Sequence, residues 1–135
     1  MNKTFKIGLI GLSLLFFCCD KNNKANSLKI GEVNEIKSGK TVENSQYNLS
    51  LQVEDVNDSR CPIGAMCFWE GTATVKFHLI TPNGHYYFTL NTHRPPNFIN
   101  DTTIEGIKYE LVDVLPYPDV SKKQRKQTVK VFVGE

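Results

Sequence analysis

The sequence predicts an all-β fold, either a single antiparallel β-sandwich or a partly open barrel of about seven strands. Short segments alternate apolar and polar residues with a period of two, which is the pattern of strands with one buried face. Turn residues separate these segments, and none of them combines a helical period with capping residues. Residues 28–135 have the length of one domain and contain no internal repeat.

Alternation is clearest in four segments. Each places apolar side chains on one face and polar side chains on the other, as Val75, Phe77 and Leu79 do within their segment. Each is therefore expected to line the core with one face. The four segments are Asn48–Val56, Thr72–Ile80, His85–Leu90 and Thr128–Val133.

Three further segments complete the predicted strands. Gly106–Pro118 is more apolar throughout and ends at prolines, which cannot donate to a strand ladder. Leu28–Ile36 and Lys40–Glu43 show a weaker strand pattern. Seven antiparallel strands are the expected total.

One hairpin can be set in register from the sequence. Asn83-Gly84 is a strong signal for a short turn. An even-length loop puts Leu79 on the same face as Tyr86, whereas an odd-length loop would expose half of the apolar row. We expect the even loop, with His78 and His85 on the outer face or rim of the sheet.

The chain begins with the pattern of an export signal. Lys3 and Lys6 form a basic head, and Ile7–Phe17 is an uncharged apolar run that ends at Cys18-Cys19. The run is too short for a membrane-spanning helix of about 20 residues. An apolar run that ends directly in cysteine resembles the lipobox of bacterial lipoproteins. In that family a peptidase cuts just before the cysteine, which then carries the lipid.

Two cysteines compete for the lipid. The family prefers Leu at −3 and a small residue at −1. Cys18 has Leu15 at −3 but the bulky Phe17 at −1, whereas Cys19 has Phe16 at −3 and the small Cys18 at −1. Cys19 is the predicted lipidation site, with Cys18 as the alternative.

This prediction divides the chain into a signal peptide (1–18), a lipidated cysteine with a flexible tether (19–27) and a β-domain (28–135). Cleavage removes Lys3 and Lys6, which leaves 14 basic residues (16 less these two) against 14 acidic residues. A formally neutral chain gives no reason to expect nucleic acid as a partner. The expected location is the bacterial cell envelope, with the lipid holding the protein to a membrane. An ordinary secretory leader is the alternative.

Cys61 and Cys67 are the only cysteines that remain in the domain. In an oxidising compartment an isolated pair usually forms a disulfide, so we expect this bond. Five intervening residues do not fit the two-residue spacing of thiol oxidoreductases. A structural zinc site needs four ligands, and no second cysteine pair is present.

The neighbouring residues suggest how the loop is held. We expect Trp69 to pack on the disulfide or under the loop, and Arg60 to pair with Asp58 or stack on Trp69. Gly71 is expected to allow a tight entry into the next strand.

The stretch DSRCPIGAMCFWEGTATV, residues 58–75, looks like a D-S-R-C-P-x4-C-x-W-x-G-x-x-x-V signature. That signature is found in small secreted bacterial lipoproteins that have no assigned activity. The resemblance implies an exported β-domain with a Cys61–Cys67 bridge, and it implies no function. Phe68 and Glu70 stand where small apolar residues are common in that group.

No pattern of catalytic or metal-binding residues is recognisable. The separations of His78, His85 and His93 match no ligand motif, so no metal site is predicted. A serine nucleophile elbow, a phosphate-binding glycine loop and an HExxH motif are all missing from the sequence. The sequence therefore predicts neither an enzyme nor a cofactor.

Two surface segments are candidates for binding. Ser121–Gln127 contains four basic residues and no acidic one, which suits either a solvated loop or a contact with anionic lipid head groups or an acidic partner. His93–Phe98 is a proline-rich connection that carries an aromatic residue. The candidate binding residues are Arg60, Trp69, Lys122, Lys123, Arg125 and Lys126.

The predicted function is that of a lipid-anchored envelope domain that acts by binding or as a structural module. One alternative is an inhibitor of an envelope or host protease that presents the loop closed by Cys61 and Cys67. Another is an envelope enzyme of unknown class. The expected partners are the membrane, through the lipid, and another envelope protein or anionic lipid.

Overall fold

The computed structural model describes residues 27–92 and 99–135 and contains only strands as regular elements within them. The predicted all-β fold is confirmed, with eight strands where seven were predicted. The lipidation candidates Cys18 and Cys19 and the segment His93–Phe98 lie outside the described residues. The strands are β1 (Glu32–Lys37), β2 (Thr41–Asn44), β3 (Leu49–Asp58), β4 (Ala73–Thr81), β5 (Gly84–Asn91), β6 (Asp101–Ile104), β7 (Ile107–Leu115) and β8 (Thr128–Gly134).

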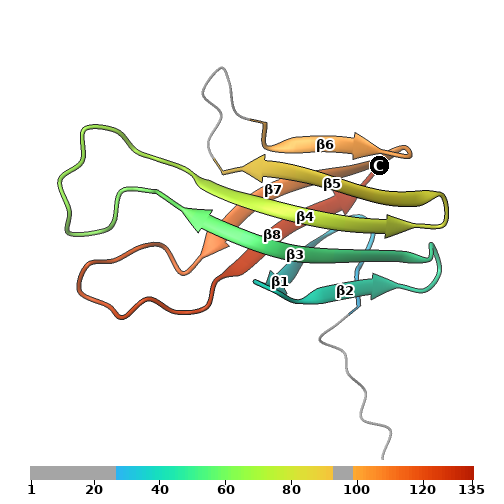
Figure 1. Ribbon diagram of the computed structural model, residues 1–135, viewed down its shortest axis with the longest axis horizontal. Helices are drawn as coiled ribbons and strands as arrows, with labels where there is room; N and C mark the ends of the chain where they lie inside the picture. The colour runs from blue at the N-terminus through green and yellow to red at the C-terminus, as the bar shows by residue number, and fades with distance from the viewer. Residues whose placement is uncertain (1–26, 93–98) are drawn as a thin grey trace, which may run out of the picture.

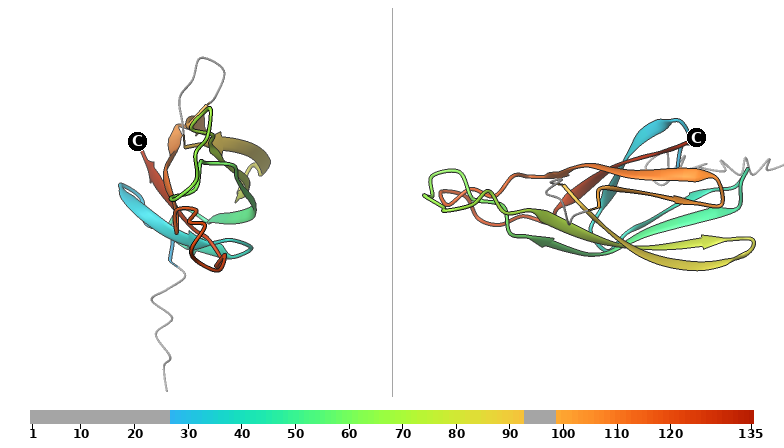
Figure 2. Two further views of the ribbon diagram at one scale, coloured as in Figure 1. Left: turned by 90° about the vertical axis from the view of Figure 1, so that its left-hand side faces the viewer. Right: turned by 90° about the horizontal axis from the view of Figure 1, so that it is seen from above.

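The strands form two four-stranded sheets that face each other as a sandwich (Figures 1 and 2). One sheet has the order β2-β3-β4-β5 and the other the order β1-β8-β7-β6. All the strand pairs within them are antiparallel. The two sheets do not close into a barrel, so the sandwich is the correct one of the two predicted architectures.

The core lies between the sheets and is built from the alternating apolar rows. On β4 every second side chain from Ala73 to Leu79 is buried, and β8 buries Val129, Val131 and Val133 in the same way. The rings of Phe77 and Phe88 stack at 5.2 Å inside this layer. The period-two pattern predicted these rows because alternate side chains of a strand point to opposite faces. The remaining buried apolar residues are Leu28, Ile36, Val42, Leu49, Leu51, Val53, Leu90, Tyr109, Leu111 and Val114.

The strand that the sequence did not predict is β6. It has only four residues, Asp101–Ile104, and it lies at the edge of its sheet beside β7. Its sequence DTTI gives no alternation to detect, because none of the four side chains is buried. Backbone pairing with β7, not a buried apolar face, defines this strand.

The β4–β5 hairpin has the predicted register. Leu79 lies opposite Tyr86 and Phe77 opposite Phe88, so the even-length loop is confirmed. The loop consists of Pro82 and Asn83, which places the turn one residue earlier than the Asn83-Gly84 signal suggested.

Two β-bulges change which face of a strand is buried. On β3 the register shifts between Val53 and Asp55, and on β7 it shifts between Leu111 and Asp113. A bulge adds one residue and so reverses the inward and outward positions that follow it. As a result Asp58 lies opposite the buried Ala73 and points into the sandwich.

The two ends of the sandwich differ, as Figure 1 shows. At one end, which we call the turn end, short turns join β2 to β3, β4 to β5 and β6 to β7. At the opposite end, which we call the loop end, two long connections extend beyond the sheets. The knot loop (residues 59–72) joins β3 to β4, and the basic loop (residues 116–127) joins β7 to β8. The views in Figure 2 agree that these two loops lie side by side.

Candidate functional site

The knot loop is closed at its base by hydrogen bonds and a disulfide. The backbone N–H of Ser59 donates to the carbonyl of Thr72 at 2.9 Å, and the N–H of Cys61 donates to the carbonyl of Glu70 at 2.7 Å. Cys61 and Cys67 are joined by a disulfide with a Cα–Cα distance of 5.9 Å, which confirms the predicted bond. The loop is therefore a continuation of the β3–β4 hairpin with a covalently closed tip.

Gly71 makes the close approach of the two sides of the loop possible. Its φ is +69°, a conformation that residues with a Cβ rarely adopt. A Cβ at this position would overlap the carbonyl group of Ser59. The prediction that glycine is needed at the entry to the next strand is confirmed.

The knot loop is also joined to the basic loop. The N–H of Ile63 donates to the carbonyl of Pro118 at 2.9 Å, and the N–H of Val120 donates to the carbonyl of Ile63 at 3.1 Å. These bonds form an isolated parallel bridge between Ile63 and Asp119. The two loops are thus parts of one surface.

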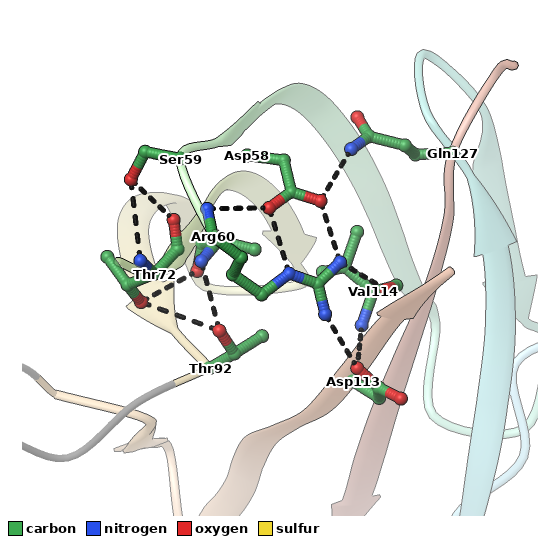
Figure 3. Close-up of polar contacts among 9 residues, drawn as sticks. Asp58, Ser59, Arg60, Thr72, Thr92, Asp113, Val114 and Gln127 are labelled. Carbon is green, nitrogen blue, oxygen red and sulfur yellow. Dashed lines mark hydrogen bonds and ion pairs between the residues drawn. The ribbon is translucent and has the colours of Figure 1, made fainter. Parts of the chain in front are cut away.

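Arg60 holds this surface to the sandwich through a buried network (Figure 3). Its Nε donates to Asp58 Oδ1 at 2.8 Å and one Nη donates to Asp58 Oδ2 at 2.6 Å, a bidentate ion pair. The same Nη donates to the carbonyl of Val114 at 2.6 Å, and the other donates to Asp113 Oδ1 at 3.2 Å. Because Asp58 belongs to β3 and Asp113 to β7, Arg60 connects the two sheets.

The side chain of Arg60 is buried, and the groups around it complement its charge. The side chains of Arg60 and Asp58 are 7% and 3% exposed. Burial would lower the pKa of Arg60, but the hydrogen bonds and charge of Asp58, with the charge of Asp113, raise it above its ordinary value. The guanidinium lies 4.4 Å from the centre of the Tyr117 ring, and Gln127 Nε2 donates to Asp58 Oδ2 at 3.1 Å. Arg60 therefore acts here as a structural cation.

These contacts confirm one expectation about Arg60 and correct another. Its predicted pairing with Asp58 is present, but its aromatic partner is Tyr117 of the basic loop and not Trp69. The prediction that Arg60 binds a partner stays a prediction, and its buried side chain leaves little surface for one.

Trp69 does not pack on the disulfide or under the loop, so that expectation was wrong. Its side chain is 77% exposed, and its nearest recorded ring contact is Phe68, at 6.5 Å between centroids. Phe68 and Met66 are fully exposed beside it. In this segment the side chains of Asp58 and Arg60 are buried instead.

The basic loop adds cations to the loop end. Lys122 pairs with Asp119 at 3.2 Å, whereas Lys123, Arg125 and Lys126 form no ion pair with any residue that the structure describes. Hydrogen bonds from Ser121 and then Lys122 lower the pKa of Asp119 and keep it ionised. The predicted loop in this segment is confirmed.

A hollow of about 430 Å³ is lined mainly by the basic loop and borders the knot loop at Pro62. Its apolar part is formed by prolines, Tyr117 and Val120, and its charged part by lysines and arginine. The two carboxylates at the hollow, Asp58 and Asp119, are both paired within the protein. The lining residues are Asp58, Pro62, Pro116, Tyr117, Pro118, Asp119, Val120, Lys122, Lys123, Gln124, Arg125 and Gln127.

The histidines lie away from the loop end. His78 and His85 are on the outer face of the β4–β5 hairpin, as predicted, with their ring nitrogens 3.1 Å apart. Tyr87 stacks on His78 at 4.3 Å. His93 lies outside the described residues. Nowhere in residues 27–92 and 99–135 do three or more His, Cys, Asp or Glu side chains gather as metal ligands would.

Asp113, Tyr117 and Gln127 are parts of the network that the sequence analysis missed. They contact Arg60 or Asp58 across long sequence separations, so no local pattern marks them. The inward turn of Asp58 did leave a signal. Leu51 and Val53 are inward residues two positions apart, as in a regular strand. The next apolar residue, Val56, is three positions after Val53, which is the spacing that a bulge produces.

Comparison with protein-family models, with curated proteins and with solved structures finds no match for this chain. No helix in the described part of the chain is long and apolar enough to cross a membrane. The features that define the protein are its eight-stranded sandwich and the disulfide-closed surface at one end of it.

Proposed function

We propose that this protein is a lipid-anchored module of the bacterial cell envelope that acts by binding, and that the loop end is its binding surface. The observation that carries the proposal is the exposure of Met66, Phe68 and Trp69 together at the tip of one loop. Ile63 and Val120, on the joined parts of the two loops, are more than half exposed as well. Large apolar side chains that gather at a protein surface mark interaction sites.

The way in which these side chains are held supports a binding role. The disulfide, the hydrogen bonds at the base of the loop and the Arg60 network fix the surface before any partner arrives. A surface that is already ordered loses less conformational entropy when it binds. Unpaired cations on the basic loop add attraction for a partner with negative charge.

The position of the N-terminus supports an anchor that leaves the loop end accessible. Leu28 joins the sandwich through a hydrogen bond to the carbonyl of Glu43 at 2.8 Å. Glu43 lies opposite Ser50, near the start of β3, whereas the knot loop follows the last residue of β3. A tether before Leu28 therefore joins the domain closer to the turn end than to the loop end.

The anchor is tested by replacing cysteines in the full chain. With Cys19→Ser we expect the protein to leave the detergent-soluble membrane fraction or to remain unprocessed. Cys18→Ser is the matched control, and we expect it to leave lipidation intact. Lipidated protein in the Cys19→Ser variant would move the anchor to Cys18, and unlipidated wild-type protein would contradict the anchor itself.

The binding surface is tested by photo-cross-linking in intact cells. A photoreactive amino acid is placed at Phe68 in one variant and at Tyr87, an exposed aromatic on the outer face of β5, in another. We expect a discrete protein or lipid adduct from position 68 and none from position 87. Adducts from position 87 alone, or from neither position, would contradict the loop end as the binding surface.

Inhibition of a protease is the second candidate function. The observation that favours it is the disulfide-closed loop, whose exposed residue Met66 directly precedes Cys67. A rigid exposed loop can occupy a protease cleft in an extended conformation. Slow cleavage next to Met66 with inhibition of the cleaving enzyme would support this role. Rapid cleavage of the loop without inhibition would exclude it.

A further inference from the structure

The exposed apolar side chains of the loop end lie on a loop that extends beyond the two sheets (Figure 1). Met66 and Phe68 are fully exposed, and Trp69 is next to them in the chain. The knot loop carries them beyond the ends of the strands, as Figure 1 shows for the connection between β3 and β4. A protein partner would need a groove shaped to receive such side chains, whereas the interfacial layer of a bilayer receives them without a preformed shape.

The residue types at the tip suit that layer. Tryptophan prefers the boundary between head groups and acyl chains, because its ring is apolar and its N–H is polar. Phenylalanine and methionine add apolar area without a buried charge. The tip of the knot loop from Ile63 to Trp69 contains no charged residue.

Cations lie on the loop that is joined to the knot loop. Lys123 and Arg125 have no ionic partner within the described residues, and the bridge between Ile63 and Asp119 holds their loop beside the knot loop, whereas Lys126 Nζ lies next to Gly39, away from the tip. An anionic membrane surface attracts such residues within about a Debye length, with roughly a fivefold gain in binding for each. The hollow of about 430 Å³ in the basic loop, with Lys123 and Arg125 in its lining and Pro62 of the knot loop at its border, has room for a phosphate-bearing head group.

We propose that the loop end docks on an anionic lipid bilayer, with Phe68 and Trp69 in the interfacial layer and Lys123 and Arg125 on the head groups. This inference rests on the proposed function, since it names the partner of the same surface. The expected lipid anchor would keep the whole domain at a bilayer, which raises the effective concentration of the loop end there even though the tether joins nearer the turn end. The disulfide between Cys61 and Cys67 restricts the conformation of the tip. The charge of Arg60, the nearest cation in the knot loop, is buried in its network with Asp58 and so is not part of the apolar surface.

Trp69 is the only tryptophan in the chain, which makes the depth of the tip directly measurable. The full-length protein isolated from cells is reconstituted with vesicles of phosphatidylcholine, either pure or with about 30% phosphatidylglycerol. Dibrominated phosphatidylcholine is then introduced as a quencher. In the anionic vesicles we expect Trp69 emission to shift to shorter wavelength by about 10 nm and to be quenched, because the ring enters the interfacial layer.

Matched variants separate the two parts of the surface. Lys123→Gln with Arg125→Gln should weaken docking about 25-fold, from about fivefold per cation. Lys29→Gln with Lys76→Gln removes the same charge from exposed positions that belong to neither long loop, and should have little effect. Phe68→Ser should reduce quenching, whereas Tyr87→Ser on the outer face of β5 should not.

Unshifted and unquenched Trp69 emission in the anionic vesicles would overturn the inference. An equal loss of vesicle docking in the two double variants would also overturn the inference, because docking would then depend on the net charge of the protein and not on the position of the cations. If position 68 still cross-links to a protein while Trp69 stays unquenched, the loop end remains the binding surface and the lipid inference fails. If both measurements are negative, the proposed function fails as well.

Discussion

The turn end and the loop end of the sandwich solve the same topological problem in different ways. Both must connect antiparallel strands. At the turn end, Pro82 and Asn83 suffice for one hairpin, and Glu105 with Gly106, both with positive φ, suffice for another. At the loop end, the connections run for residues 59–72 and 116–127 and require their own buried interactions.

The difference also appears in the chemistry of the two ends. At the turn end, Glu105 accepts a hydrogen bond from the hydroxyl of Tyr86 at 2.7 Å, a contact exposed to solvent. At the loop end, Asp58 and Arg60 form an ion pair that is almost completely buried. A buried ion pair has a high desolvation cost and adds little net stability, so it is better explained by the geometry that it fixes. The comparison indicates that the turn end closes the fold and that the loop end is built to present a surface.

The largest expected effect is on the buried ion pair. Arg60→Ala leaves the carboxylate of Asp58 buried without its partner, and we expect a loss of about 3–5 kcal/mol in the free energy of unfolding. Arg125→Ala, an exposed cation of the same end, should change it by less than about 0.5 kcal/mol. Urea denaturation measures both. The double variant Asp58→Asn, Arg60→Met removes both charges and should recover part of the lost free energy of unfolding. A loss below about 1 kcal/mol in Arg60→Ala would show that the ion pair does not hold the loops.

Substituting one glycine at each end compares the two ends directly, because Gly71 and Gly106 both have positive φ. Gly106→Ala at the turn end meets no atom within 4 Å, so only the backbone conformation is strained, and we expect a loss of about 1 kcal/mol. Gly71→Ala at the loop end adds a collision with the backbone of Ser59, and we expect at least about 3 kcal/mol. Thermal unfolding of the two variants measures the difference. Equal losses would mean that the two sides of the knot loop do not approach as closely as described.

Removal of the disulfide should have a smaller effect. For so short a loop the entropic estimate is about 2 kcal/mol, so the Cys61→Ser, Cys67→Ser variant should fold and melt several degrees lower. Because Trp69 is already exposed, its emission in solution should change little on reduction. A large shift in emission would show that Trp69 is covered in the native protein.

The smallest effect at neutral pH concerns Tyr109 in the core. Burial, with a contribution from the charge of Glu105, raises its pKa to about 12. Because the unfolded chain loses this proton at a lower pH than the folded protein does, the free energy of unfolding falls as the pH rises from about 10 to about 12. A shift of that size corresponds to about 3 kcal/mol.

Tyr109→Phe tests this assignment. The hydroxyl is buried and has no hydrogen-bond partner among the described residues, so its removal should stabilise the protein by about 1 kcal/mol at pH 7. The variant should also lose much of the decline in stability above pH 10. Tyr87→Phe, on the exposed face, should stay within about 0.5 kcal/mol of the wild type. An unchanged alkaline decline in Tyr109→Phe would assign it to another group.

The sequence predicted the parts of the fold that depend on local periodicity. The apolar rows, the hairpin register and the disulfide follow from side-chain alternation, turn length and cysteine count. β6 escaped prediction because an edge strand of four polar or half-buried residues needs no apolar pattern. Asp58 was predicted as a partner of Arg60, but Asp113 and Tyr117 escaped because they lie more than 50 residues away, and only the packed sandwich brings them to it.

The position of Trp69 shows a different limit. A single aromatic beside a disulfide is usually a packing residue, so burial was the natural expectation. The large buried side chain of this loop is instead that of Arg60, whose inward partner Asp58 depends on the bulge in β3. The bulge therefore places a charged pair inside the sandwich, which the local sequence around Trp69 does not reveal.

Hydrogen exchange at the amides of Cys61, Ile63 and Val120 tests most directly whether the loop end is an ordered surface. These N–H groups donate to the carbonyls of Glu70, Pro118 and Ile63, which close the knot loop and join it to the basic loop. We expect each to exchange on the order of a hundredfold or more slowly than in an unstructured peptide. Exchange at the unstructured rate for all three would contradict the account, because two freely moving loops cannot present a fixed surface.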